Sequence, residues 1–297
     1  MSEFVKIIEV GPRDGLQNEV HQISAAEKVE LIRNLKKAGV KHIEAGAFVS
    51  PKSIPQMADT TYVMEGLDMI KYGLKLSVLV PNIKGYENAV AAGAKEVAIF
   101  ASASESFSQK NVNCSIAESF ERFAEIFERA KVEHIKVRAY ISCIAACPYE
   151  GAVAPEKVVV MANKLIEMGA YEISLGDTTG VANPAAIKRL IFELSATIPM
   201  HKIAVHFHDT YGQALANIYA ALEVGVRTID CSVAGLGGCP YAPGSSGNVA
   251  TEDVVFMLDN LGYSTGIDLE MLVRTAWYVS DLFDREPVSK VARAMGR

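Results

Sequence analysis

Met168-Gly169-Ala170-Tyr171-Glu172-Ile173 joins the end of a helical pattern to the start of a strand pattern, and the chain uses this kind of junction four times. The other three copies are Ala38-Gly39-Val40-Lys41-His42-Ile43, Ala92-Gly93-Ala94-Lys95-Glu96-Val97 and Val224-Gly225-Val226-Arg227-Thr228-Ile229. In each copy the glycine supplies the left-handed residue that stops a helix. The four junctions precede the second, fourth, sixth and eighth strand patterns, so the repeating unit is a pair of βα modules.

Short β-branched runs alternate with longer amphipathic segments along the whole chain. Eight runs predict strands, at 5–10, 40–45, 74–80, 96–101, 135–142, 171–175, 202–207 and 227–233. Helical patterns lie between them at 25–38, 82–92, 117–130, 155–168, 184–197, 213–224 and 252–261, the first opened by a Ser24–Glu27 capping box. This alternation predicts an α/β protein with a parallel sheet, and eight units favour a closed (β/α)8 TIM barrel.

An open doubly wound sheet is the alternative fold. The first strand is followed by Gly11-Pro12-Arg13-Asp14-Gly15 and not by Gly-x-Gly-x-x-Gly, so a dinucleotide site of the doubly wound kind is not indicated. No composition shift marks a linker. We therefore expect one catalytic domain over residues 1–297, with 268–284 as an added C-terminal helix that covers one end of the barrel.

Composition excludes several classes of function. The net charge of -6 argues against a nucleic-acid partner, which requires clustered Lys and Arg. No segment reads as a signal peptide or a membrane span, so we expect a protein without a membrane partner. The five cysteines are an odd number scattered through a long chain, which indicates reduced thiols and a cytoplasmic location.

Two histidines, His206 and His208, stand at the end of the seventh strand pattern. On a strand, residues i and i+2 project to the same face, so both imidazoles point at one spot and can offer two nitrogen ligands to a metal. In the alternative reading, one histidine is a hydrogen-bonded core residue and the other caps the next helix. The pair by itself does not choose between these readings.

The barrel brings further polar residues to the same face, because all parallel strands end there. Arg13 and Asp14 end the first strand, Glu44 the second and Asp177 the sixth. Closure makes the eighth strand a neighbour of both the seventh and the first. Asp14 can therefore approach His206 and His208 from one side, while Asn248 reaches them from the loop after the eighth strand. Such a mixed nitrogen and oxygen site suits Mg²⁺ or Mn²⁺.

Arg13 and Cys239 are two further candidate catalytic residues. Arg13 stands where a cation could stabilise an enolate or carbonyl oxygen, although it could also form a structural ion pair with Glu44 or Asp177. Cys239 lies in the glycine-rich segment 234–248, which could close over a site and carry a thiol into it. The alternative for that segment is a flexible surface loop with an idle cysteine.

Several of these motifs together resemble the 3-hydroxy-3-methylglutaryl-CoA (HMG-CoA) lyase family, from about Val5 to Leu261. The motifs are Gly11-Pro-Arg-Asp-Gly-Leu-Gln-Asn-Glu19, Phe48-Val-Ser-Pro-Lys52, Ser174-Leu-Gly-Asp-Thr178, His206-Phe-His-Asp-Thr-Tyr-Gly-Gln-Ala-Leu-Ala-Asn217 and Gly235-Leu-Gly-Gly-Cys-Pro-Tyr-Ala242. The arginine-aspartate and histidine-x-histidine motifs are shared with a wider superfamily that includes isopropylmalate and homocitrate synthases. The cysteine motif is the more specific part.

The resemblance implies a retro-Claisen cleavage of HMG-CoA to acetyl-CoA and acetoacetate, with an acyl-CoA as the small-molecule partner. A homodimer is a candidate assembly that the sequence does not fix. It implies metal ligation by Asp14, His206, His208 and Asn248. It implies a catalytic set of Arg13 as enolate stabiliser, Cys239 as general acid/base, Glu44 and Asp177 as supporting carboxylates, and His206. Lys110 and Asn111 are implied as contacts of the CoA moiety.

One departure from the family pattern concerns substrate preference. Gly46-Ala47 stands where many of these lyases are expected to have Thr-Ser, and the smaller residues would suit a roomier pocket for a larger 3-hydroxy-3-alkylglutaryl-CoA. A Claisen-type synthase of the same superfamily is a second alternative, but the chain has no room for the regulatory domain that many such synthases carry. A metal-binding scaffold without catalysis is the third, and it leaves Arg13, Asp177 and Cys239 unexplained.

Overall fold

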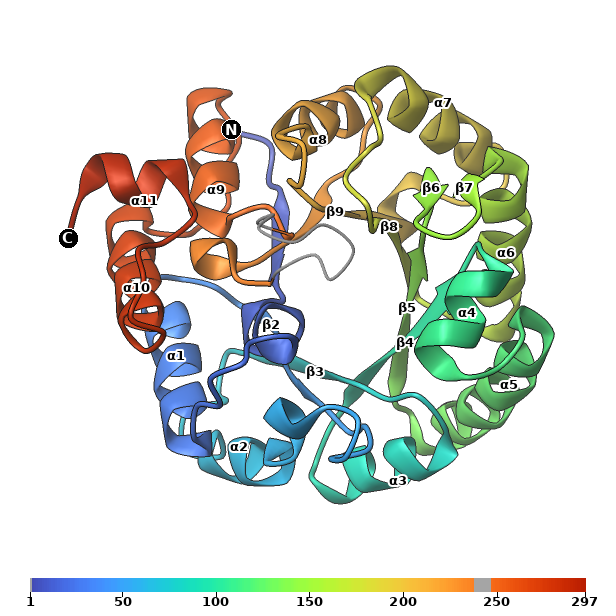
Figure 1. Ribbon diagram of the computed structural model, residues 1–297, viewed down its shortest axis with the longest axis horizontal. Helices are drawn as coiled ribbons and strands as arrows, with labels where there is room; N and C mark the ends of the chain where they lie inside the picture. The colour runs from blue at the N-terminus through green and yellow to red at the C-terminus, as the bar shows by residue number, and fades with distance from the viewer. Residues whose placement is uncertain (1, 238–246) are drawn as a thin grey trace.

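Eight parallel strands close into a barrel in the order β1-β10-β9-β8-β5-β4-β3-β2, in a computed structural model that describes residues 2–237 and 247–297 (Figure 1). The strands are β1 (Lys6–Glu9), β2 (His42–Ala47), β3 (Lys75–Leu79), β4 (Glu96–Ser102), β5 (Lys136–Ser142), β8 (Glu172–Asp177), β9 (Ile203–Phe207) and β10 (Thr228–Cys231). Each of the eight overlaps a predicted run, with bounds that differ by up to a few residues. The closed barrel is therefore confirmed, and the open doubly wound sheet is wrong.

Barrel closure is made by β1, which pairs with β2 on one side and with β10 on the other. Ile7 lies opposite Ile229 of β10, and Asp230 of β10 lies opposite His206 of β9. The first and seventh strands are thus separated by a single strand. This arrangement puts the end of the first strand within reach of the histidine pair.

Helices surround the barrel as an outer ring (Figure 1). They are α1 (Ala25–Lys37), α2 (Thr60–Gly66), α3 (Ile83–Ala91), α4 (Glu105–Val112), α5 (Ile116–Glu133), α6 (Pro155–Met168), α7 (Pro184–Ser195), α8 (Ala214–Glu223) and α9 (Thr251–Asn260). The Ser24–Glu27 capping box before α1 is confirmed. Helices α2 and α4 were not predicted, because segments of 7 and 8 residues are too short to show a clear helical period.

The four glycine junctions have the conformation that the sequence predicts. Gly39, Gly93, Gly169 and Gly225 have φ angles of 95°, 86°, 117° and 102°, in the region that side chains disfavour. Each stops a helix and turns the chain into the next strand. A residue with a Cβ at Gly39 would also meet the carbonyl oxygen of Gly266 at 2.4 Å.

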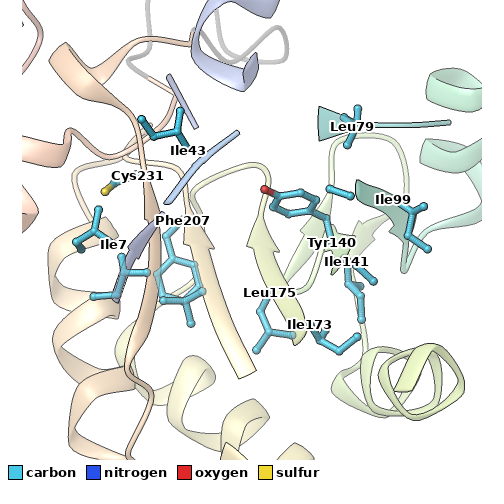
Figure 2. Packing of buried hydrophobic residues seen from close by; sticks show 14 of the residues in the cluster. Ile7, Ile43, Leu79, Ile99, Tyr140, Ile141, Ile173, Leu175, Phe207 and Cys231 are labelled. Atoms are coloured by element: carbon cyan, nitrogen blue, oxygen red, sulfur yellow. The ribbon is translucent and has the colours of Figure 1, made fainter. Parts of the chain in front are cut away.

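The apolar core lies mainly between the strands and the helical ring. Ile43, Ile99, Ile141 and Phe207 are all 1% exposed or less, and Figure 2 shows them among other aliphatic side chains of the strands. Tyr140, the neighbour of Ile141 on β5, directs its hydroxyl away from Ile141 in the same view. Alternate residues of a strand face opposite sides, so one set builds the core and the other fills the barrel interior.

The predicted additional C-terminal helix is confirmed, although its extent and its place at the barrel differ from the prediction. Residues 268–284 contain α10 (Leu269–Asp281), and a further helix, α11 (Lys290–Met295), follows. Helix α10 packs beside α1 and α9 at the side of the barrel and does not lie across an end (Figure 1). Within the described ranges, no helix is long and apolar enough to span a membrane.

Short helical turns and a small hairpin lie between the main helices and strands. They are the π-helical turn η1 (Gly11–Gly15) and the 3₁₀ turns η2 (Pro55–Met57), η3 (Met200–Lys202) and η4 (Val233–Gly235), while β6 (Ala146–Cys147) and β7 (Gly151–Ala152) form a small hairpin after β5. Turn η4 is held by two fully buried carboxylates. Glu9 accepts the backbone N–H of Val233 at 2.9 Å, and Glu252 accepts that of Ala234 at 2.9 Å.

Burial raises the pKa of Glu252 to about 8 and that of Glu9 to about 7, against a usual value of 4.5. Both groups stay protonated in the folded chain at pH values where they ionise in the unfolded chain. The free energy of unfolding is therefore highest, as far as these two groups set it, below about pH 4.5. It falls as the pH rises toward 7–8, where the buried carboxyl groups must ionise.

Glu252→Gln removes one of these ionisations without removing the acceptor oxygen. Between about pH 5 and about pH 8 the free energy of unfolding of the wild type should fall relative to that of the variant by a few kcal/mol. Urea unfolding across this range measures the difference, with the exposed Glu270→Gln as control. Parallel profiles for wild type and Glu252→Gln would contradict the assignment.

Candidate active site

A cavity of about 580 Å³ opens at the carboxyl ends of the strands. Its polar lining comes from the segments that follow β1 to β4 and from the ends of β5, β8 and β9. The lining includes Arg13, Asp14, Gln17, Asn18, Ser50, Ser53, Asn82, Asn111, Asn113, Arg122, Tyr140, Ser142, Thr178, His206 and His208. This is the face on which barrel enzymes build their active sites.

Arg13 and Asp14 lie in the π-helical turn η1, where Pro12 and two glycines turn the chain sharply at the end of β1. The Nε of Arg13 donates to Oε2 of Glu44 at 2.7 Å, and its Nη1 donates to Oδ1 of Asp14 at 2.6 Å. Burial opposes the charge, but Glu44 and Asp14 outweigh it and raise the pKa of Arg13. The guanidinium is therefore a fixed positive charge in the cavity wall.

The ion pair that the sequence offered as an alternative for Arg13 is thus present with Glu44. It does not withdraw the arginine from the site, because Arg13 also lines the cavity. In the part of the chain that the structure describes, no ion pair joins Arg13 to Asp177.

Glu44 lies within β2 and not at its end as predicted, because the strand continues to Ala47, and its side chain is fully buried. Its Oε2 accepts from Arg13 and, at 3.2 Å, from the hydroxyl of Tyr140, whereas Oε1 has no hydrogen-bond partner among the described residues. Burial raises the pKa of this carboxyl, and the positive charge of Arg13 opposes the rise. Glu44 therefore positions the guanidinium by a charged hydrogen bond.

Asp14, His206 and His208 form one cluster, as barrel closure predicts. One ligand atom from each residue can be chosen so that all three lie within 4.8 Å of one another. The Nε2 of His206 is 3.7 Å from Oδ2 of Asp14, and the two imidazole centroids are 5.6 Å apart. Asn248 faces His208 across a β-bridge and donates its amide Nδ2 to Oδ2 of Asp14 at 2.8 Å.

The electrostatics of this cluster suit a divalent cation. Burial raises the pKa of Asp14, but Arg13 and the two histidines outweigh it and hold the pKa well below its usual range. Burial and the neighbouring His206 lower the pKa of His208 to about 4, so its imidazole is neutral. An ionised carboxylate with neutral imidazole is the ligand form that metal binding requires. The buried Nδ1 of His208 has no partner within the described residues.

Asp177 ends β8, as predicted, but its side chain serves the backbone that follows. It accepts the N–H groups of Gly180 at 3.2 Å and Ala182 at 2.9 Å. Burial raises its pKa to about 6, and these backbone hydrogen bonds oppose the rise. Its neighbours Gly176 and Thr178 line the cavity, so the hydrogen bonds of Asp177 hold the backbone at the edge of the cavity in place.

The remaining predicted residues lie in different places. Asn111 of α4 lines the cavity. The ammonium of Lys110 lies 3.9 Å from the ring centroid of Tyr149, outside the cavity lining. Cys239 lies outside the described residues.

The expectation that Gly46 and Ala47 widen the pocket is not supported. A Cβ on Gly46 would meet Thr60 of α2 at 2.7 Å, and Ala47 shares hydrogen bonds with the Thr60 hydroxyl. The pair therefore packs toward the helical ring, and the cavity lining does not include it. Small residues at 46 and 47 allow helix α2 to pack closely against β2.

Sequence reasoning missed three polar residues inside the barrel. The ring centroid of Tyr140 lies 5.6 Å from the guanidinium carbon of Arg13 and 5.0 Å from that of Arg138. Asp230 lies beside His206. All three missed residues, Arg138, Tyr140 and Asp230, stand within strands. Polar residues at alternate positions within otherwise apolar strand patterns could have indicated them. The sequence analysis considered polar residues only at the ends of strands.

The HMGL-like family model matches residues 4–279 of the chain. The mitochondrial hydroxymethylglutaryl-CoA lyase of Homo sapiens is 53% identical over 290 residues, which are 98% of this chain and 89% of that protein. The crystal structure of hydroxymethylglutaryl-CoA lyase from Pseudomonas aeruginosa superposes with a TM-score of 0.96 at 49% identity, covering 99% of this chain and 98% of that one. The structure of an HMG-CoA lyase from Acinetobacter baumannii in complex with coenzyme A and 3-methylmalate superposes with a TM-score of 0.93 at 37% identity. The match covers 98% of this chain and 95% of that one.

His208→Asn tests the cluster without substrate. We expect Mn²⁺ binding to weaken by at least about 10-fold, because one nitrogen ligand is lost while the fold is kept. Isothermal titration of metal-free protein with Mn²⁺ measures it. His201→Asn is the matched control, because His201 is exposed in η3 at the opposite end of the same strand. Equal Mn²⁺ affinity for His208→Asn and the wild type would exclude His208 as a ligand.

Proposed function

The chain belongs to the HMGL-like family of hydroxymethylglutaryl-CoA lyases, and from this premise we propose that it cleaves HMG-CoA to acetyl-CoA and acetoacetate. One observation carries the chemistry. The buried guanidinium of Arg13 lines the cavity and lies 2.6 Å from Asp14, which clusters with His206 and His208. The positive charge of Arg13 thus stands beside the ionised Asp14 and the neutral His208.

The reaction breaks the bond between the thioester α-carbon and the carbon that bears the tertiary hydroxyl. A base takes the hydroxyl proton, the oxygen becomes the ketone of acetoacetate, and the bonding pair remains on the α-carbon as a thioester enolate. A proton is then delivered to that carbon to give acetyl-CoA. The site must therefore favour loss of one proton, stabilise an enolate and return a proton.

A divalent cation, Mg²⁺ or Mn²⁺, is the proposed cofactor, and when bound it would lower the pKa of the substrate hydroxyl. The proposed ligands are Asp14, His206, His208 and Asn248. The cluster of three ligand atoms, the ionised Asp14 and the neutral His208 support the assignment. Asn248 donates to Asp14 in this structure, so its ligand role requires the amide oxygen to turn toward the cation.

Arg13 is the proposed enolate stabiliser. Its guanidinium is held on one side by Glu44 and on another by Asp14, so it meets negative charge at the thioester oxygen without reorganising. Glu44 and Asp177 are proposed as positioning carboxylates, the first for Arg13 and the second for the rim from 178 to 182. Cys239 is proposed as the general acid/base on the family resemblance alone.

The acyl-CoA substrate is supported by the cavity itself. It is about 580 Å³ and is walled by amide and hydroxyl side chains as well as apolar ones, which suits a thioester with a polar tail. Asn111 on its wall is the proposed contact of the CoA moiety, with Lys110 on the same helix. Packing of Gly46 against Thr60 removes the reason to favour a larger 3-alkyl group.

We also propose a reducing, cytoplasmic setting and a homodimer. The four cysteines that the structure describes are free and buried, which supports the first. The similar curated lyases are named mitochondrial, so cell fractionation is the test of location. Sedimentation of the purified protein tests the assembly.

Arg13→Gln should lower kcat for HMG-CoA cleavage by about 10²–10³-fold, because the charge that meets the enolate is lost. Acetoacetate formation in the presence of Mg²⁺ measures it. The control is Arg189→Gln, which removes an exposed guanidinium on α7. Turnover within error of the wild type would refute the role of Arg13.

Removal of the cation should abolish turnover, because the substrate hydroxyl then loses the ion that lowers its pKa. Added Mg²⁺ or Mn²⁺ should restore turnover. The assay compares chelator-treated protein with the same sample after the metal is returned. Full activity in protein shown to be metal-free would exclude a metal-dependent cleavage.

A further inference from the structure

Asp230 is a buried carboxylate in the middle of β10, behind the histidine pair. It is 1% exposed and lies directly opposite His206 in the register of β9 and β10. Side chains of register partners on neighbouring parallel strands project to the same side of the sheet. Oδ2 of Asp230 is accordingly 3.5 Å from Nδ1 of His206.

Three donors fix the Asp230 carboxylate. Arg138 of β5 reaches across the barrel with Nη1 on Oδ2 at 2.9 Å and Nη2 on Oδ1 at 2.8 Å. Ser174 of β8 donates its hydroxyl to Oδ2 at 2.7 Å. Arg138 is itself held by Glu172, whose Oε1 accepts its Nε at 2.7 Å and whose Oε2 accepts the ammonium of Lys6. The carboxylate therefore cannot follow His206 if the ring turns.

The imidazole of His206 has two ends with different surroundings. Nε2 faces Asp14 and the cavity. Nδ1 is buried, has no hydrogen-bond partner among the described residues, and lies 3.5 Å from Oδ2 of Asp230. A neutral imidazole carries its proton on one nitrogen and its lone pair on the other.

We propose that Asp230 is a positioning residue that holds the proton of His206 on Nδ1, so that the Nε2 lone pair faces the cation site before any cation arrives. This inference rests on the proposed cation site. A carboxylate that accepts from the far nitrogen fixes both the tautomer and the ring orientation of a metal-ligating histidine, and it makes the ligand more basic. Arg138 and Ser174 hold the acceptor in place.

The position of the histidine proton can be observed in the metal-free protein. Nitrogen-15 NMR in mildly alkaline buffer distinguishes the two tautomers, and the His206 signals are identified by their loss in His206→Asn. We expect the proton of wild-type His206 on Nδ1. A proton on Nε2 would overturn the proposal, whether or not any variant folds.

Asp230→Asn keeps the shape of the side chain but can turn its amide N–H toward Nδ1. The His206 proton should then move to Nε2, and Mn²⁺ should bind about 10- to 100-fold more weakly by isothermal titration. Glu172→Gln is the matched control, because it removes the other carboxylate charge that pairs with the Arg138 guanidinium, and Glu172 does not contact His206 in the ion pairs of the described residues. It should keep the Nδ1 proton and the wild-type Mn²⁺ affinity.

Equal weakening of Mn²⁺ binding in both variants, with the tautomer unchanged, would make Asp230 a structural partner of Arg138 and overturn the proposal. Neither readout uses substrate. A protein with the predicted tautomer and metal affinities but no cleavage of HMG-CoA would therefore refute the proposed function and leave this inference standing.

Discussion

Closure of the barrel between β1 and β10 is the constraint on which the site depends. Asp14 and His206 are nearly two hundred positions apart, yet the pairing of the first strand with the last leaves only β10 between their strands. An open sheet of the same elements would put β1 and β9 at separate places. The approach of Asp14 to His206 and His208 is a consequence of this one contact.

The interior of the barrel holds charges that would be costly if they were unpaired. Lys6, Glu172, Arg138 and Asp230 form a chain of alternating sign that ends at His206. Each buried carboxylate has a guanidinium, an ammonium or a hydroxyl donor, so the chain is satisfied where an isolated ion would not be. It fills the barrel interior with polar contacts, and its last member, Asp230, lies beside His206 of the cavity wall.

The fold and the histidine pair could be predicted from sequence because both show in periodic or local patterns, and Asp14 joined the pair through the predicted closure of the barrel. The eight β-branched runs indicated the number of strands, the glycine junctions indicated the repeated pair of βα modules, and the spacing of His206 and His208 indicated their common face. Orientation within a turn was not predictable: Asp177 turns to the backbone of Gly180 and Ala182, and Gly46 turns to Thr60. Contacts across the barrel, such as Arg138 with Asp230, join strands that only the closed structure brings together.

The central claim is that the closed barrel builds a cation site from the ends of its first and seventh strands. A crystal structure of the protein with Mn²⁺, using anomalous scattering to locate the ion, tests this most directly. The account predicts a Mn²⁺ peak bonded to a carboxylate oxygen of Asp14 and to imidazole nitrogens of His206 and His208. A fully occupied peak elsewhere, with these three side chains unligated, would contradict it.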